Sequence, residues 1–324
     1  MLAKLPRFSN SRHIESASAV SLHDSTSSMW YDPIVGFGLR LAAGGLVPAR
    51  WFQSGLPAPE QRKSKRGRLR LEIVSHCWKY AHFLVYQLSS LAKFPPRDTS
   101  VTMTVYYCDE DAGTVALLDY FSQLSVPNVQ WNWRKLPRTS LFRRAIGRNH
   151  AALGTAADWI WFTDCDLMFR DRCIDTLAEQ LQGSQHALHY PKSERTTSLL
   201  PDADPLLLFN PAEINIMDVD DTRFIEHLRT RATGPLQITH GDVARACGYC
   251  NALGYYQKPS ETWRKAREDR AFRWLLGTQG VALDVPGVYR IRHENKGRYT
   301  GSRVSNTLRR HLRRAICAFT ERAE

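Results

Sequence analysis

The sequence predicts an α/β domain built on a mainly parallel sheet with helices on both faces. Short apolar segments rich in β-branched and aromatic residues alternate with segments of helical spacing. The apolar segments are nearly continuous rather than alternating, as expected of strands buried on both faces. A length of 324 residues accommodates one large domain of this kind with terminal extensions.

The individual elements follow one another from residue 71 onward. Apolar runs predict strands at 71–75, 101–107, 129–133 and 158–163. Apolar side chains spaced three and four apart predict helices at 79–93, 114–124 and 141–155. A further β-like run, VYRIR, occupies 288–292. Strands joined by helices in this order are typical of βαβ units.

The formal net charge of +12 is concentrated at the two ends of the chain. Residues 1–70 carry 11 basic and 4 acidic side chains, and residues 290–324 carry 10 and 3. The centre therefore holds 23 basic and 25 acidic side chains. A nearly neutral centre is unlike a protein whose main face binds a nucleic-acid backbone, and it favours a catalytic body with basic attachments.

These patterns divide the chain into three parts. We expect a partly disordered extension over 1–67, a catalytic domain over 68–298 and a basic amphipathic helix over 299–324. The boundary near Gly67 lies inside the basic run RKSKRGRLR. Apolar residues at helical spacing over 304–319 would pack on the body, dock on an anionic membrane surface, or accompany binding to nucleic acid or another polyanion.

Cysteine usage indicates a reducing compartment, and hydropathy predicts no membrane-spanning helix. Seven cysteines, several of them in apolar runs, form a poor disulfide framework. Cys247 and Cys250 have zinc-ligand spacing, but no second Cys/His pair at suitable spacing accompanies them. The apolar stretch 34–47 is interrupted by Arg40 and is too short to span a bilayer. We expect a cytoplasmic protein whose basic ends allow peripheral contact with the inner membrane face.

Polar and acidic side chains follow three of the predicted strands, at Ser75 and His76, at 109–111 and at 164–166. Ligands of open α/β sheets bind beyond the carboxyl ends of the strands. Two carboxylates separated by one residue, such as Asp164 and Asp166, can hold one Mg²⁺ or Mn²⁺ ion while phosphate oxygens take the remaining positions. The alternative for this Asp-x-Asp is a solvated turn between strand and loop.

The stretch GRNHAALGTAADWIWFTDCDLMF, from Gly147 to Phe169, resembles GT-A type glycosyltransferases, particularly the family 2 group and its galactosyltransferase-like relatives. These enzymes carry Arg-Asn near the start of a helix, an apolar strand and then Asp-x-Asp. Glu268 and Asp269 stand in the place of their Glu-Asp motif, and His293 follows where several relatives have a third metal ligand. The Gly-Gly stretch that precedes Glu-Asp in the family is missing, so the resemblance leaves the acceptor site open.

The resemblance implies a metal-dependent glycosyltransferase with a GT-A catalytic domain, and an inverting outcome is favoured. It would move a sugar from a nucleotide-diphosphate donor, with a UDP-sugar favoured, to a hydroxyl of a glycan, a lipid-linked or another polyanionic acceptor. Asp166 would bind Mn²⁺ or Mg²⁺ directly, and Asp164 would reach the ribose or a metal-bound water. His293 would be a third ligand; alternatively it is a structural histidine and the neighbouring basic residues bind the diphosphate.

The same resemblance suggests roles for further residues. Asp269 would be the general base that deprotonates the acceptor, with Glu268 in support. A charge pair at a helix N-terminus is the alternative for both. Ser75, Asp109 and Arg148 would recognise the nucleotide. Asp111 is the alternative to Asp109. The aromatic residues Tyr249, Tyr255 and Trp263 would stack on an acceptor sugar or belong to the core.

Three other functions are compatible with parts of the pattern. Phosphotransfer of the haloacid-dehalogenase type also uses Asp-x-Asp after an apolar strand, but it normally requires a threonine soon afterwards, where this chain has Leu167 and Met168. A noncatalytic nucleic-acid-binding protein with a degenerate GT-A fold would explain the basic ends. A glycosyltransferase acting on nucleic acid would combine both features.

Overall fold

A seven-stranded sheet forms the centre of the computed structural model, which describes residues 32–53, 55–262 and 267–294. Its strand order is β10-β6-β9-β4-β1-β2-β3. Among these strands only β9 runs antiparallel to its neighbours, β4 and β6. The strands are β1 Arg70–His76, β2 Ser100–Tyr107, β3 Val129–Lys135, β4 Trp159–Phe162, β6 Leu188–Pro191, β9 Gln237–His240 and β10 Val281–Leu283.

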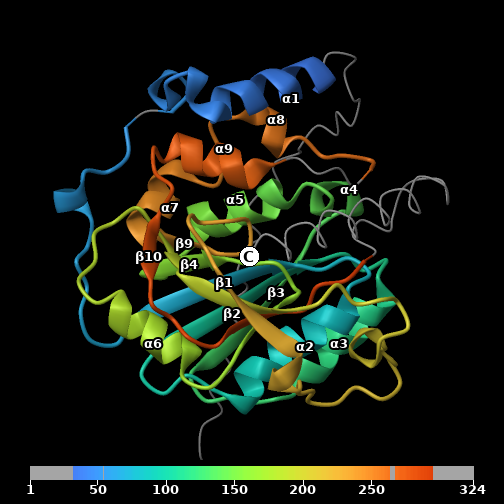
Figure 1. Ribbon diagram of the computed structural model, residues 1–324. Helices are drawn as coiled ribbons and strands as arrows, with labels where there is room; N and C mark the ends of the chain where they lie inside the picture. Colours follow the sequence, from blue (N-terminus) through green and yellow to red (C-terminus); the bar gives the residue numbers. More distant parts are fainter. Residues whose placement is uncertain (1–31, 54, 263–266, 295–324) are drawn as a thin grey trace, which may run out of the picture.

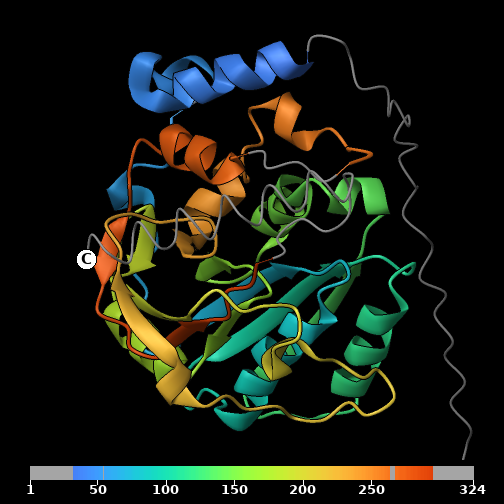
Figure 2. The same ribbon diagram turned by 45° about the vertical axis from the view of Figure 1, so that its right-hand side comes forward.

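Helices cover both faces of this sheet, which confirms the predicted fold class (Figures 1 and 2). On the lower face in Figure 1 lie α2 Ala81–Lys93 and α3 Ala112–Ser122. On the upper face lie α5 Arg144–Gly154, α7 Gly241–Cys247 and α9 Glu268–Leu275. The described chain also contains α4 Arg138–Leu141, α6 Cys173–Gln180 and α8 Gly254–Gln257.

The predicted strands and helices up to residue 163 are confirmed, with each end within three residues of its predicted position. Burial explains this agreement. Ile73, Val74, Trp161 and Phe162 are fully buried, because helices pack on both faces of β1 and β4. Strands of this kind need apolar side chains at every position, which makes them visible in the sequence.

A second sheet of four strands brings a distant part of the chain to the end of β4. Its order is β5-β11-β7-β8, and β11 is antiparallel to β5 and pairs Tyr289 with Met168. Just beyond the pair, the backbone N–H of Ile291 donates to the carbonyl of Asp166 at 3.0 Å. This pairing places the segment that contains His293 beside the Asp-x-Asp turn. The strands are β5 Leu167–Phe169, β7 Ser193–Thr197, β8 Phe224–Leu228 and β11 Val288–Arg290.

The described part of the N-terminal extension lies on the body. Helix α1 Asp32–Leu41 and the π-helical turn η1 Ala42–Leu46 lie over α8 and α9 (Figures 1 and 2). The basic run is also attached, since Lys65 Nζ pairs with Asp158 at 2.8 Å and the Gly67 N–H donates to Gln182 at 2.7 Å. The boundary near 67 therefore lies in a segment held by polar contacts rather than in a free linker.

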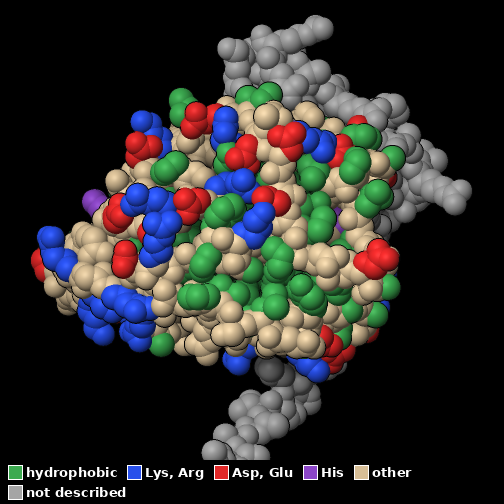
Figure 3. Space-filling model, turned by 90° about the horizontal axis from the view of Figure 1, so that it is seen from below, with side chains coloured by type: hydrophobic (Ala, Val, Ile, Leu, Met, Phe, Trp, Pro, Cys, Tyr) green, Lys and Arg blue, Asp and Glu red, His purple; other side chains and the backbone are tan. Residues whose placement is uncertain are grey.

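The structure can also be compared with the predictions about cysteines, membrane-spanning helices and surface charge. Cys77, Cys108, Cys165, Cys173, Cys247 and Cys250 are free thiols, as expected. No helix in the described ranges is both long and apolar enough to span a bilayer. Acidic and basic side chains are interspersed on the face shown in Figure 3. The helix predicted over 299–324, Cys317 and Trp263 lie outside the described residues.

Candidate active site

A cavity opens where β1 and β4 end, at the carboxyl edge that the sequence indicated. Its lining includes Asp164 and Asp166 from the turn after β4, and His293 from the segment after β11. Arg144 of α5 and His76 at the end of β1 complete its polar wall. The apolar wall consists of Trp78, Tyr80, Phe83, Leu141 and Phe142. The fold thus brings the three predicted metal ligands to one cavity from two distant parts of the sequence.

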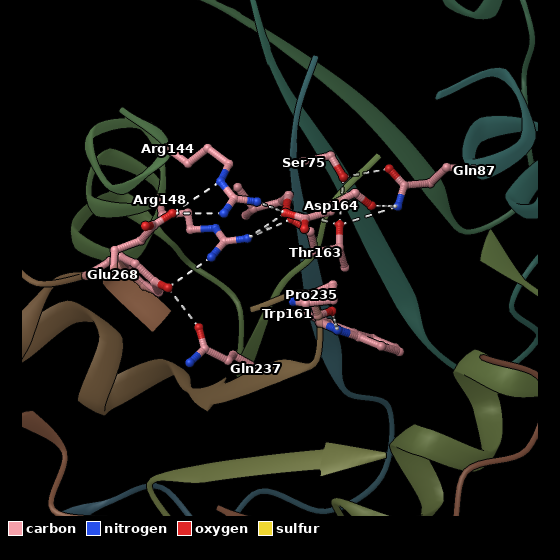
Figure 4. Close-up of polar contacts among 12 residues, drawn as sticks. Ser75, Gln87, Arg144, Arg148, Trp161, Thr163, Asp164, Pro235, Gln237 and Glu268 are labelled. Carbon is pink, nitrogen blue, oxygen red and sulfur yellow. Dashed lines mark hydrogen bonds and ion pairs between the residues drawn. The ribbon is translucent and has the colours of Figure 1, made fainter. Parts of the chain in front are cut away.

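Two arginines one helical turn apart hold the Asp164 carboxylate (Figure 4). Arg144 Nη1 forms a short ion pair with Asp164 Oδ1, and Arg148 Nη2 lies 3.2 Å from the same oxygen. Arg148 is completely buried and also donates to the Thr163 carbonyl and the Tyr249 hydroxyl, both at 2.9 Å. Arg148 therefore positions Asp164 and has no exposed atom for a nucleotide, which differs from its predicted role.

A buried hydrogen-bond cluster supports the turn from the other side (Figure 4). The Ser75 hydroxyl lies 2.5 Å from Gln87 Oε1 and 2.6 Å from Thr163 Oγ1. Gln87 Nε2 donates to the Asp164 carbonyl at 3.1 Å. Because Ser75 is fully buried and its hydroxyl is occupied within the protein, it supports the end of β4 instead of facing a nucleotide as predicted.

His76, the next residue along β1, faces the cavity in place of Ser75. Successive side chains of a strand point to opposite sides, so only one of the two can do so. The His76 ring stacks on Tyr106 at a centroid distance of 5.1 Å, and neither ring nitrogen has a hydrogen-bond partner in the described structure. Burial lowers the pKa of His76 well below its ordinary value, and Arg148 and Arg144 lower it further. The imidazole is therefore neutral near pH 7 and can both donate and accept.

The donor atoms at the cavity suit a divalent cation by their chemistry. Asp164, Asp166 and His293 offer carboxylate oxygens and one imidazole, a set that suits Mn²⁺ better than Mg²⁺. Across 32–53, 55–262 and 267–294, however, no three His, Cys, Asp or Glu side chains are close enough to hold a metal together. Arg144 also occupies an Asp164 oxygen. The guanidinium of Arg144 therefore lies beside the carboxylate of Asp164, the first residue of Asp-x-Asp.

The acidic turn after β2 does not belong to the lining of this cavity. Asp109 is exposed and pairs with Lys135 at 3.1 Å. Asp111 is buried and caps α3, where it accepts from the Thr114 backbone N–H at 3.3 Å and from its hydroxyl at 2.6 Å. Asp111 also accepts from the Lys79 backbone N–H. The structure thus gives Asp111 a local capping role rather than a nucleotide contact.

Glu268 and Asp269 begin α9 and point to different neighbours. The Glu268 carboxylate is 4% exposed and pairs with Arg144 Nη2 at 3.0 Å, so Arg144 bridges it to Asp164. The Asp269 carboxylate is 32% exposed and lies 3.5 Å from Arg273 Nη1. Neither carboxylate lines the cavity, but Glu268 is connected to it through one guanidinium.

The predicted aromatic contacts separate into different environments. Tyr249 is fully buried, and its ring stacks on Phe272 at a centroid distance of 4.2 Å, so it belongs to the core. Tyr255 lies under α1, where its hydroxyl closely approaches Gly36. Asn149 accepts from the Tyr249 backbone N–H at 2.9 Å and so fixes the local backbone.

Sequence reasoning missed Arg144 as a residue of this cavity. The available signal was its spacing of four residues from Arg148, which places both side chains on one helix face. Their common partner became visible only in the folded chain.

Comparison with known proteins gives distant structural likenesses. No protein-family model matches the chain, and no curated protein matches it in sequence. TarS residues 1–349 from S. aureus is 12% identical with a TM-score of 0.41, over 69% of this chain and 60% of that one. The same protein in complex with UDP-GlcNAc is 12% identical with a TM-score of 0.42, over 72% of this chain and 62% of that one. The match spans less than two thirds of both TarS chains.

A third likeness is to the mannosyltransferase PcManGT from Pyrobaculum calidifontis, solved in complex with GDP-Man and Mn²⁺. It is 16% identical with a TM-score of 0.40, over 88% of this chain and 76% of that chain.

Proposed function

We propose that this chain is a metal-dependent, inverting glycosyltransferase that uses a nucleotide-diphosphate sugar, with a UDP-sugar favoured. The observation that supports the proposal is the cavity at the carboxyl ends of β1 and β4, where Asp164, Asp166, Arg144 and His293 converge. Carboxylates that bind a cation and a guanidinium that binds phosphate are the groups a sugar diphosphate requires. The acceptor would be a hydroxyl of a glycan, a lipid-linked or another polyanionic molecule.

Arg144 and His76 are the residues of this cavity that we assign to the donor in addition to the predicted ones. Arg144 would donate to diphosphate oxygens from its position between two carboxylates. Because both ring nitrogens of His76 are buried, this ring would contact the nucleotide only by packing against it from the cavity wall. Asp166 would bind a divalent ion, and Asp164 and His293 would complete the ligand set only by moving closer than they stand in this structure. The ion, when bound, would neutralise the charge of the leaving diphosphate.

In the transfer step, the acceptor hydroxyl oxygen forms a bond to the anomeric carbon as the bond from that carbon to the diphosphate oxygen breaks. The hydroxyl proton passes to a carboxylate. We retain Asp269 as this base because its carboxylate is partly exposed, whereas that of Glu268 is buried and paired with Arg144.

Thermal-shift measurements with nucleotide sugars, with and without Mn²⁺, test the donor site. A donor at one hundred times its Kd stabilises the folded protein by about 2.7 kcal/mol, or about 5–10 °C in Tm for a domain of this size. We expect Asp166→Asn to lose the metal-dependent part of this shift. Asp109→Asn is the matched control, because that carboxylate is exposed and outside the cavity. If Asp166→Asn kept the full metal-dependent shift in Tm, Asp166 would not be a metal ligand.

The base is tested separately with Asp269→Asn and Glu268→Gln. We expect Asp269→Asn to lower kcat by at least about a hundredfold while the donor-induced shift in Tm persists. Glu268→Gln should instead alter donor KM, because it removes one charge partner of Arg144. The rate of nucleoside diphosphate release in the presence of acceptor gives kcat and donor KM for both variants. The reverse result would reassign the base to Glu268.

A further inference from the structure

A second cavity lies on the N-terminal side of the molecule, between η1 and α9. Its volume is about 540 Å³, within the range of sites that bind small organic ligands. Three arginines line it, namely Arg231, Arg270 and Arg273, together with the glycines of η1 and the turn at 277–279. No acidic side chain belongs to its described lining.

The positive charge of this cavity is only partly compensated. Arg273 is 7% exposed; its Nε donates to Gln279 at 3.1 Å, and Asp269 lies 3.5 Å from its Nη1. In the described parts of the chain, no carboxylate lies within ion-pair distance of Arg231 or Arg270. Burial lowers the pKa of Arg273, and the neighbouring charge of Arg231 lowers it further, so the two guanidinium groups act on each other.

The backbone around the arginines leaves room for a ligand to approach. Arg270 Nε donates to the Ala43 carbonyl at 3.2 Å, which fixes its guanidinium against η1. Gly45 and Gly277 have φ values of 96° and 62°, and at both positions nothing lies within 4 Å of where a Cβ would stand. Glycine is suited to such positions because the backbone can adopt positive φ and be approached closely.

We propose that this cavity binds the phosphate group of an anionic ligand. Guanidinium groups match phosphate oxygens through paired N–H donors, and two of them without carboxylate partners, Arg231 and Arg270, favour an anion over a neutral ligand. The site is distinct from the donor cavity, since the two cavities share no lining residue. The proposal does not depend on transferase activity.

The surroundings of the cavity favour a lipid as the source of the phosphate. Ile34, Phe37 and Leu41 lie on one face of α1 and are 64%, 56% and 47% exposed. Phe52 packs on Trp274 of the cavity wall at a centroid distance of 5.2 Å. An exposed apolar stripe next to a basic cavity is the arrangement by which a helix lies on an anionic membrane surface. A soluble phosphate compound would be bound by the same arginines, so a separate arm of the test measures binding of soluble phosphates.

The test uses the full chain and the double variant Arg231→Gln/Arg270→Gln, which leaves the buried Arg273 intact. The control is Arg97→Gln/Arg172→Gln, which removes the same charge from exposed sites elsewhere. One arm measures binding of inorganic phosphate and pyrophosphate by calorimetry. The other measures sedimentation with phosphatidylglycerol vesicles, compared with phosphatidylcholine vesicles.

We expect the cavity variant, and not the control, to bind at least about tenfold more weakly in one or both arms. Loss in the vesicle arm, reproduced by Ile34→Ser/Phe37→Ser with phosphate binding unchanged, identifies the lipid source. Loss in the phosphate arm alone identifies a soluble ligand. Equal binding by the cavity variant and the control in both arms overturns the proposal, and this result is independent of the donor-site measurements.

Discussion

Replacing Arg148 with methionine would test whether this guanidinium is a structural group or a nucleotide ligand. The side chain is completely buried and connects the Asp164 carboxylate, the Thr163 carbonyl and the Tyr249 hydroxyl. Methionine keeps an unbranched apolar side chain but removes every donor. Breaking a buried ion pair typically costs about 3–5 kcal/mol.

For Arg148→Met, the loss in the free energy of unfolding should fall near the lower end of that range, because Arg144 remains paired with Asp164. A loss of about 3 kcal/mol in the free energy of unfolding corresponds to a fall in Tm of about 6–12 °C. Urea denaturation followed by circular dichroism measures the first quantity, and a thermal melt measures the second. Arg138→Met is the control, because that arginine is exposed and pairs with an exposed Glu110.

A particular pair of results would refute this reasoning. If Arg148→Met unfolded at the wild-type urea concentration and lost only its response to nucleotide sugars, Arg148 would be a ligand contact. The sequence-based role would then be right and the role inferred from burial would be wrong. A destabilised protein that still responds to the nucleotide sugar supports the structural role.

Three further predictions follow from individual side chains. Asp111→Ala removes the N-cap of α3 and should lower the free energy of unfolding by about 1–2 kcal/mol in urea melts, whereas Asp109→Ala should leave it nearly unchanged. Burial lowers the pKa of His189 to about 4, so the unfolded chain takes up the proton first as the pH falls below about 6.5. This histidine should reduce stability by about 2 kcal/mol at pH 5, and His189→Gln should flatten the pH dependence between 6.5 and 4; an unchanged slope would contradict this. In α5, Gly147→Ala places a methyl group 2.2 Å from a buried histidine nitrogen and should lower Tm, whereas Gly154→Ala meets nothing within 4 Å and should not; equal melting temperatures would refute the packing argument.

Much of the first half of the domain could be predicted because its strands are buried on both sides. β4 is apolar throughout, and a strand of this kind shows in composition alone, whereas β1 and β2 are buried at nearly every position but include polar residues. After residue 169 the strands are three to five residues long, and β8 is mostly exposed. Apart from the β-like run at 288–292, which contains β11, these segments carry too little pattern to predict. Their order in the sheets depends on contacts between distant residues.

The sequence by itself determined that two carboxylates end a buried strand at the ligand edge of a parallel sheet. Only the tertiary structure decided which neighbour of each candidate pair faces the cavity. His76 rather than Ser75 lines it, and Glu268 rather than Asp269 reaches its arginine. Adjacent residues point in different directions on a strand or a helix, and which direction is inward depends on the elements that pack against them.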